Sequence, residues 1–186
     1  MKKFENNVFS FDAETNGLYW EAFSLAAVVY DSKWDLLKTF LARSPIKWDV
    51  DQWVETNVLP EMEGIEETHA SYEAMLKDFA EFYKQWKNGA DIVFHMGMPV
   101  ESTVLKDMVE KGEIGIFDGP YPPKDLVWYL DMVGEDPTSV DGYAKKYNLE
   151  ITDYGTSHNP LYDSEVAAKV YLDLMKRREK IIEQSV

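Results

Sequence analysis

Cysteine is absent from the 186 residues of this sequence. Without thiols there is no disulfide framework and no thiolate metal site, so any metal ion must be held by oxygen or imidazole ligands. Ligands of that kind favour hard divalent cations such as Mg²⁺.

Long apolar runs are missing as well. No segment approaches the roughly 18 consecutive apolar residues that a membrane-spanning helix needs, and residues 1–7 lack the apolar stretch of a signal peptide. We therefore expect a soluble protein with no membrane partner and a cytoplasmic location.

Positive charge is scarce, since 19 Lys and Arg residues stand against 34 Asp and Glu residues and give a formal net charge of -15. This balance argues against a protein that holds long nucleic acid through a broad basic face. An enzyme that binds only a chain end needs few phosphate contacts, and bound cations would supply local positive charge. If the protein binds nucleic acid, we predict a cleft that is less acidic than the remaining surface.

The residues that are present suffice for one hydrophobic core. With 45% hydrophobic side chains in 186 residues, we expect a single domain that spans residues 1–186. Three apolar runs predict strands at 8–11, 23–30 and 34–41, and the short link between the last two predicts an antiparallel hairpin.

Helical periodicity follows the predicted hairpin. Apolar residues recur at three- and four-residue spacing between residues 71 and 87, which indicates a helix that buries one face. A short buried strand at 91–95 and a helix from Pro99 to about residue 111 come next. Three further helices are expected at 125–132, 140–147 and 161–183. This order predicts an α/β protein with a mixed sheet and helices packed on its faces, but it does not predict the strand order.

Asp12 and Glu14 directly follow the first apolar run. Residues two apart in an extended chain point to the same side, so both carboxylates can reach one point in space. Such a pair suits Mg²⁺, which binds a few carboxylates together with water and phosphate oxygens. Acidic pairs at strand ends are also typical of solvated turn residues, and the pair alone does not decide between these interpretations.

His158 and Asp163 stand at the start of the predicted terminal helix. An aspartate in the first helical turn can simply favour the helix dipole, and a loop histidine is often only a solvated side chain. Histidine is, however, the side chain that exchanges protons near neutral pH. A loop histidine five residues before a helix-start aspartate can approach the same site as a general base.

Together, the Asp12-x-Glu14-Thr15-x-Gly17 motif and the H-x-x-x-x-D arrangement of His158 and Asp163 resemble the DEDDh group of DnaQ-like exonucleases. The resemblance covers nearly the whole chain. It implies the RNase H-like fold, with a mixed sheet, antiparallel N-terminal strands and helices on both faces. It further implies a 3′-5′ exonuclease that acts on the 3′ ends of single-stranded RNA or DNA or on short oligonucleotides, and homodimers are frequent in related enzymes.

The resemblance also implies a two-metal-ion mechanism with Mg²⁺ or Mn²⁺. The metal ligands it implies are Asp12, Glu14, Glu101 and Asp163. Among these, Asp12 would bridge the two ions, and His158 would act as the general base. The family's contacts to the terminal nucleotide correspond to Thr15 and Leu18.

The middle motif departs from the family pattern. The family shows an asparagine, two residues, an aromatic residue and an aspartate that opens a helix, whereas this sequence has Gly97 at the first of these positions and Glu101 at the last. The extra methylene of Glu101 requires either a backbone that is set back or a carboxylate that acts through water. Asp91 and Asp107 are less favoured alternative ligands.

Two other function classes stay open at this point. One is a catalytically weak nucleic-acid-binding module, which Glu101 and the net charge of -15 would suit. The other is a metal-dependent nucleotide phosphohydrolase. Tyr19, Trp20 and Tyr121 are candidates for stacking on bases, although Tyr19 and Trp20 are equally suited to core packing.

Overall fold

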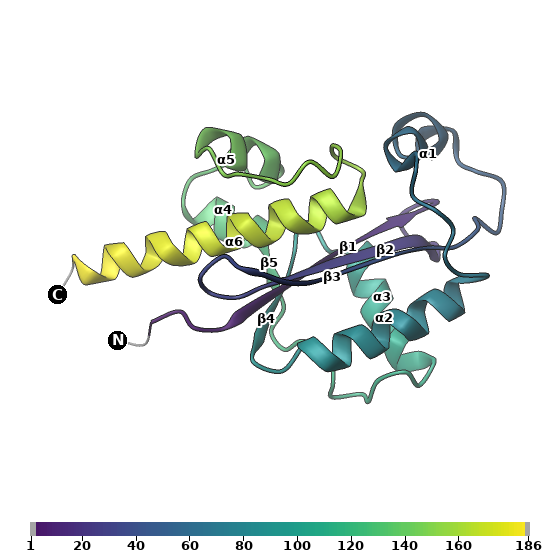
Figure 1. Cartoon of the computed structure of the whole chain (residues 1–186), viewed down its shortest axis with the longest axis horizontal. Helices are drawn as coiled ribbons and strands as arrows, with labels where there is room; N and C mark the ends of the chain where they lie inside the picture. The colour runs from purple at the N-terminus through teal and green to yellow at the C-terminus, as the bar shows by residue number, and fades with distance from the viewer. Residues whose placement is uncertain (1–2, 185–186) are drawn as a thin grey trace.

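A five-stranded mixed sheet forms the centre of the molecule (Figure 1). The structure is a computed structural model that describes residues 3–184. In spatial order the strands are β3 (Leu36–Arg43), β2 (Ala22–Tyr30), β1 (Asn7–Thr15), β4 (Ala90–Phe94) and β5 (Lys124–Asp125). The strands β1, β2 and β3 pair antiparallel, and the predicted hairpin is confirmed. The strand β4 pairs parallel with β1 on one side and with β5 on the other.

Six α-helices and one 3₁₀ helix are present in residues 3–184. They are α1 (Gln52–Asn57), η1 (Leu59–Met62), α2 (Tyr72–Trp86), α3 (Val100–Glu110), α4 (Leu126–Met132), α5 (Val140–Lys146) and α6 (Pro160–Glu183). The five predicted helices are confirmed as α2 to α6 within a residue or two at each end. The short elements α1, η1 and β5 were not predicted.

The helices cover both faces of the sheet, as Figure 1 shows: α2 and α3 on one face, α4, α5 and α6 on the other. Alternation along β1 separates the two cores. Phe9 and Phe11 pack with α2, whereas Val8 belongs to the core under α6. Because side chains alternate along a strand, Asp12 and Glu14 share the α6 side of β1 with Val8.

The helix α6 lies across the central strands and contacts β1, β2 and β4. Asn159 caps its start, because the Asn159 side chain accepts hydrogen bonds from the N–H groups of Leu161 and Tyr162. One turn later, the buried Ser164 hydroxyl donates to the carbonyl oxygen of Ala26 in β2 at 3.2 Å. The first turn of α6 is thereby fixed against the sheet. None of the helices in residues 3–184 has the length and apolar character needed to span a membrane.

Candidate active site

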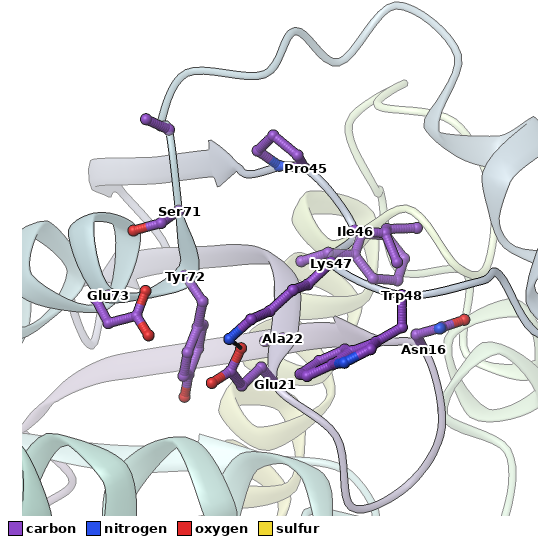
Figure 2. A pocket seen from close by; sticks show the side chains of 12 residues that line it. Asn16, Glu21, Ala22, Pro45, Ile46, Lys47, Trp48, Ser71, Tyr72 and Glu73 are labelled. Atoms are coloured by element: carbon purple, nitrogen blue, oxygen red, sulfur yellow. Dashed lines mark ion pairs between the residues drawn. The ribbon is translucent and has the colours of Figure 1, made fainter.

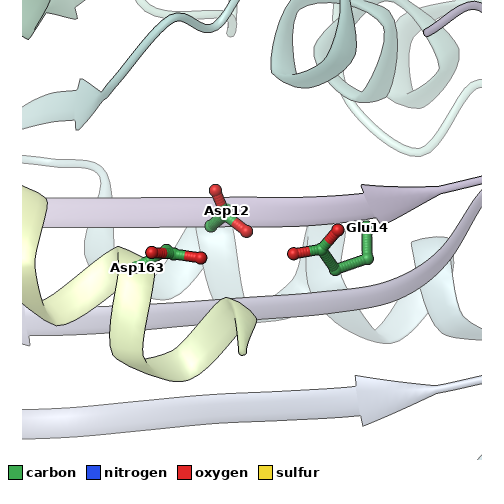
Figure 3. Close-up of side chains that lie close together, drawn as sticks. All are labelled: Asp12, Glu14 and Asp163. Carbon is green, nitrogen blue, oxygen red and sulfur yellow. The ribbon is translucent and has the colours of Figure 1, made fainter. Parts of the chain in front are cut away.

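Three carboxylates from the two ends of the sequence meet where β1 passes the start of α6 (Figure 3). Asp12, Glu14 and Asp163 each place one carboxylate oxygen within 4.8 Å of the others. We call these three residues the acidic cluster. Strand alternation accounts for the first two, and the capped first turn of α6 accounts for the third.

Glu101 lies beside the acidic cluster rather than within it. Its side chain is only 4% exposed, and its Oε1 accepts a hydrogen bond from the Ala13 N–H of β1 at 3.2 Å. The negative charge of Glu101 is close enough to raise the pKa of both Asp12 and Glu14. The structure therefore brings all four predicted metal ligands to one cleft, and Glu101 reaches it from α3.

Gly97 shows how the departure from the family pattern is accommodated. A Cβ atom at this position would lie 2.2 Å from the ring of Phe94, so any side chain would collide with that ring. The backbone N–H groups of Met96 and Gly97 donate to the Asp125 carboxylate at 3.2 Å and 3.1 Å. The loop that leads into α3 and Glu101 is thus held by β5 and by the Phe94 ring.

Burial and mutual repulsion raise the pKa values of Asp12, Glu14, Glu101 and Asp163. Burial is the larger cause for Asp12 and Glu14, and the charges of Asp163 and Glu101 add to it. Burial raises the pKa of Glu101 to about 8 and that of Asp163 to about 7. One oxygen of Asp12, Oδ2, is buried and has no hydrogen-bond partner in residues 3–184. A buried carboxylate oxygen without a partner is costly, and a cation would satisfy it.

The cleft around the cluster has a volume of about 490 Å³ and no Lys or Arg among its lining residues. Its carboxylates are Asp12, Glu14, Glu101, Asp141 and Asp163. The prediction of a cleft less acidic than the rest of the surface is therefore wrong for the protein alone. Hard divalent cations would fit this set of oxygen ligands and offset its charge.

His158 lines the same cleft from the loop that precedes α6. We call residues 152–159, which precede α6, the histidine loop. The His158 backbone N–H donates to Oδ2 of Asp163 at 2.8 Å, which ties this loop to the acidic cluster. The His158 ring packs edge-to-face against Trp53, with ring centroids 5.3 Å apart. His158 also has a positive φ of 72°, a conformation that is uncommon for residues other than glycine.

The segment of α1 and η1 braces the histidine loop from outside. Asn16, two residues after Glu14, donates to the Asp49 carbonyl at 2.9 Å and accepts from the Asp51 N–H at 2.8 Å. These bonds fix the start of α1. Trp53 of α1 then packs against the His158 ring. The sequence contains a capping aspartate at residue 51, but a helix of six residues is too short to show periodicity.

A buried ion pair anchors the other side of the histidine loop. Glu165 is fully buried and accepts hydrogen bonds from the hydroxyls of Tyr30 and Thr152, each at 2.8 Å. Lys169 lies 2.6 Å from the same carboxylate. Because Thr152 begins the loop and Tyr30 belongs to β2, Glu165 fastens the loop to the sheet.

Comparison with known proteins finds a solved structure of similar fold but no protein of similar sequence. No family model matches the chain, and no curated protein matches its sequence. Among solved structures, exonuclease X in complex with 5′ overhanging duplex DNA is similar to this chain with a TM-score of 0.59. The match covers 92% of this chain and 93% of that chain at 13% sequence identity.

The chain therefore shares the α/β fold of that structure, with a mixed five-stranded sheet. The predicted mixed sheet with antiparallel N-terminal strands and helices on both faces is confirmed. Within this fold the acidic cluster lies near the end of the central strand β1.

The remaining predicted residues lie farther from the acidic cluster. Thr15 ends β1 just beyond Glu14, and Leu18 is 62% exposed in the turn that follows. Two carboxylates named as alternative ligands have other partners: Asp91 accepts from the Tyr171 hydroxyl and Asp107 from the Tyr72 hydroxyl, each at 2.7 Å. Neither belongs to the cluster.

Two cleft residues were missed from the sequence. Asp141 lines the cleft from α5, accepts the Tyr162 hydroxyl at 2.6 Å and raises the pKa of Asp163. His95 lines it from the end of β4 and contacts the Pro137 carbonyl through Nε2 at 2.8 Å. An acid in the first turn of a short helix and a histidine after a strand have many ordinary uses, so the sequence offers no signal that singles them out.

The raised pKa values predict a pH-dependent stability that metal reverses. An acid whose pKa is higher in the folded state stabilises the fold below its unfolded pKa and loses this contribution as the pH rises through the folded value. For Asp163 the loss runs from about pH 4 to about pH 7. In EDTA at pH 8, Asp163→Asn should therefore melt about 5 °C above the wild type, a gain of about 2 kcal/mol.

The matching measurement adds Mg²⁺. Magnesium should raise the melting temperature of the wild type more at pH 8 than at pH 5, because protonated carboxyl groups bind cations poorly. Asp163→Asn keeps a side-chain oxygen that can accept from the His158 N–H, so it removes the charge without opening the loop. An equal magnesium-induced rise in the variant and the wild type would contradict a metal site at the cluster.

Proposed function

We propose that this protein is a metal-dependent 3′-5′ exonuclease, with one exonuclease domain over residues 1–186, that hydrolyses the terminal phosphodiester of single-stranded RNA or DNA. The observation that carries the proposal is the acidic cluster, in which Asp12 presents a buried carboxylate oxygen without a protein partner. Its position at the end of β1 in an RNase H-like exonuclease fold supports the same function. Mononucleotides are the expected product.

In the proposed mechanism the carboxylates hold Mg²⁺ or Mn²⁺. Asp12, Glu14 and Asp163 would be direct ligands, and Glu101 would complete the site from α3. Bound divalent cations would offset the negative charge of the scissile phosphate and favour ionisation of the attacking water. Glu101 has a further task, because its hydrogen bond to the Ala13 N–H fixes the strand segment between Asp12 and Glu14.

His158 is proposed as the general base that accepts the proton of the attacking water. The hydrogen bond from its backbone to Asp163 supports this role, because it sets the base at a fixed place relative to one ligand. The contact with Trp53 limits rotation of the imidazole ring. Thr15 and Leu18, at the end of β1 and in the exposed turn, would contact the terminal nucleotide.

The proposal is tested by one incubation series. Oligonucleotides labelled at the 5′ end, as RNA and as DNA, are mixed with the protein in Mg²⁺, in Mn²⁺ and in EDTA, and products are resolved on a sequencing gel. A ladder that shortens one nucleotide at a time from the 3′ end, and only with metal, is the expected result. Free phosphate from nucleotides with no ladder would indicate a nucleotide phosphohydrolase, and binding without any product would indicate a nucleic-acid-binding module.

A further inference from the structure

A second cavity lies beyond the end of β1, with Asn16 in its lining (Figure 2). Its volume is about 220 Å³. Asn16 forms part of its wall two residues after Glu14, a separation of at most about 7 Å between the two Cα atoms. Trp48 and Tyr72 supply aromatic surface, and Ile46 and Pro45 complete an apolar side. The cavity therefore adjoins the proposed active site without sharing its carboxylates.

The charges around this cavity are already paired. Lys47 lies 3.8 Å from Glu21, the ion pair drawn in Figure 2, and Glu73 lies 3.8 Å from Lys111. The Lys47 ammonium group is also 5.0 Å from the centre of the Trp48 ring. Because each charged lining residue has a partner of opposite sign, the cavity suits a neutral flat ring better than a phosphate group.

Two tryptophans form an exposed aromatic surface at the cavity mouth, which we call the Trp20–Trp48 ledge. Their ring centroids are 4.7 Å apart and the planes meet at 68°, an edge-to-face packing. Trp20 is 46% exposed and Trp48 is 42% exposed. Large aromatic rings at this exposure are available for contact with a ligand.

Gly17 fixes the ledge in place. Its φ of 138° is one that other residues rarely adopt, and a Cβ atom there would lie 2.8 Å from Cδ1 of Trp20. The Trp20 N–H donates to the Gly17 carbonyl at 3.0 Å, which closes the turn. The ledge is thus formed before any ligand arrives, and binding to it needs little reordering.

We propose that the cavity and the Trp20–Trp48 ledge bind a nucleobase of the substrate strand, upstream of the nucleotide that is removed. The inference rests on the proposed function and adds an upstream subsite to it. A base stacked on Trp48 makes contacts that are independent of sequence, since every base has an aromatic face. The subsite also lets a protein of charge -15 hold a polyanion with few cations, because affinity comes from the base and not from the phosphate.

The test measures binding and needs no turnover. Six-nucleotide DNAs labelled at the 5′ end, each with one abasic position, are titrated with protein in Ca²⁺ and followed by fluorescence anisotropy. For the wild type, removing the base at one internal position should raise Kd about 10-fold, a typical loss for one stacked base. Trp48→Leu should raise Kd about as much for the intact DNA and should show no further loss at that abasic position.

Trp128→Leu is the matched control, because Trp128 is 68% exposed on α4 and lines neither cavity. It should bind like the wild type. Trp20→Leu serves as a second ledge variant, and melting curves establish that both ledge variants fold. If Trp48→Leu and Trp20→Leu still distinguish intact from abasic DNA as the wild type does, the subsite is overturned. An equal loss of affinity for intact and abasic DNA would indicate a backbone contact and would overturn it as well.

Cleavage of the same DNAs in Mg²⁺ separates this inference from the proposed function. Stepwise cleavage with no ledge-dependent discrimination would overturn the subsite and leave the exonuclease standing. Ledge-dependent discrimination with no cleavage would overturn the exonuclease and retain base binding. Absence of binding to these DNAs and to the same sequences made as RNA would overturn both.

Discussion

Asp12→Asn should lower kcat for 3′-end cleavage at least about 1000-fold. Asp12 lies at the centre of the acidic cluster, and its Oδ2 has no hydrogen-bond partner in the described part of the chain. An amide there presents one neutral oxygen and one N–H₂ group to a cation, so binding of Mg²⁺ is lost together with catalysis. Initial rates on a labelled oligonucleotide and Mg²⁺ titration by calorimetry measure the two losses.

The same substitution should leave the fold intact and more stable in EDTA, because it removes a buried charge that repels its neighbours. Asp107→Asn is the matched control. The partly buried Asp107 carboxylate accepts a hydrogen bond from the Tyr72 hydroxyl. The amide oxygen of asparagine can accept the same bond, so full activity is expected. Undiminished cleavage by Asp12→Asn would remove the catalytic assignment.

The second large effect is expected at His158. His158→Asn should lower kcat roughly 100- to 10,000-fold through loss of the general base, with KM and Mg²⁺ affinity close to the wild type. Asparagine is chosen because it tolerates the positive φ of this position better than alanine does. Its backbone N–H still donates to Asp163, so the acidic cluster keeps its geometry.

The test measures kcat and the Mg²⁺ affinity of His158→Asn separately, each between pH 6 and pH 9. His69→Asn is the control, since His69 lies outside the cleft and contacts Thr68 and Asp78. Retention of wild-type kcat by His158→Asn would exclude the general-base role. A parallel fall in Mg²⁺ affinity would instead assign the residue to the metal site.

The strands and long helices were predictable because their signals are local. Continuous apolar runs and three- and four-residue spacing depend only on neighbours in the chain, and both survive in β1, β2 and α2. The convergence of Asp12 with Glu14 was also predictable, since it follows from strand alternation. The strand order and the position of α1 were not, because both depend on contacts between segments distant in sequence.

The position of Glu101 relative to the acidic cluster could not be predicted from the sequence. The sequence shows a longer carboxylate where the family has aspartate, but the outcome depends on how far α3 stands from β1. Gly97 against the Phe94 ring and Asp125 against the loop backbone set that distance, and neither contact has a sequence pattern. The acidity of the cleft was underestimated, because Asp141 adds a fifth carboxylate from α5 and no Lys or Arg lines the cleft.

The acidic cluster joins β1, among the earliest segments of the chain, to α6, the last helix of residues 3–184. A polypeptide emerges from the ribosome N-terminus first, so Asp12 and Glu14 exist well before Asp163 and His158 do. In a nascent chain that has not yet released α6, the face of the sheet that α6 covers together with α4 and α5 is only partly covered. Under the proposed function, the metal site is thus incomplete until α6 packs on the sheet.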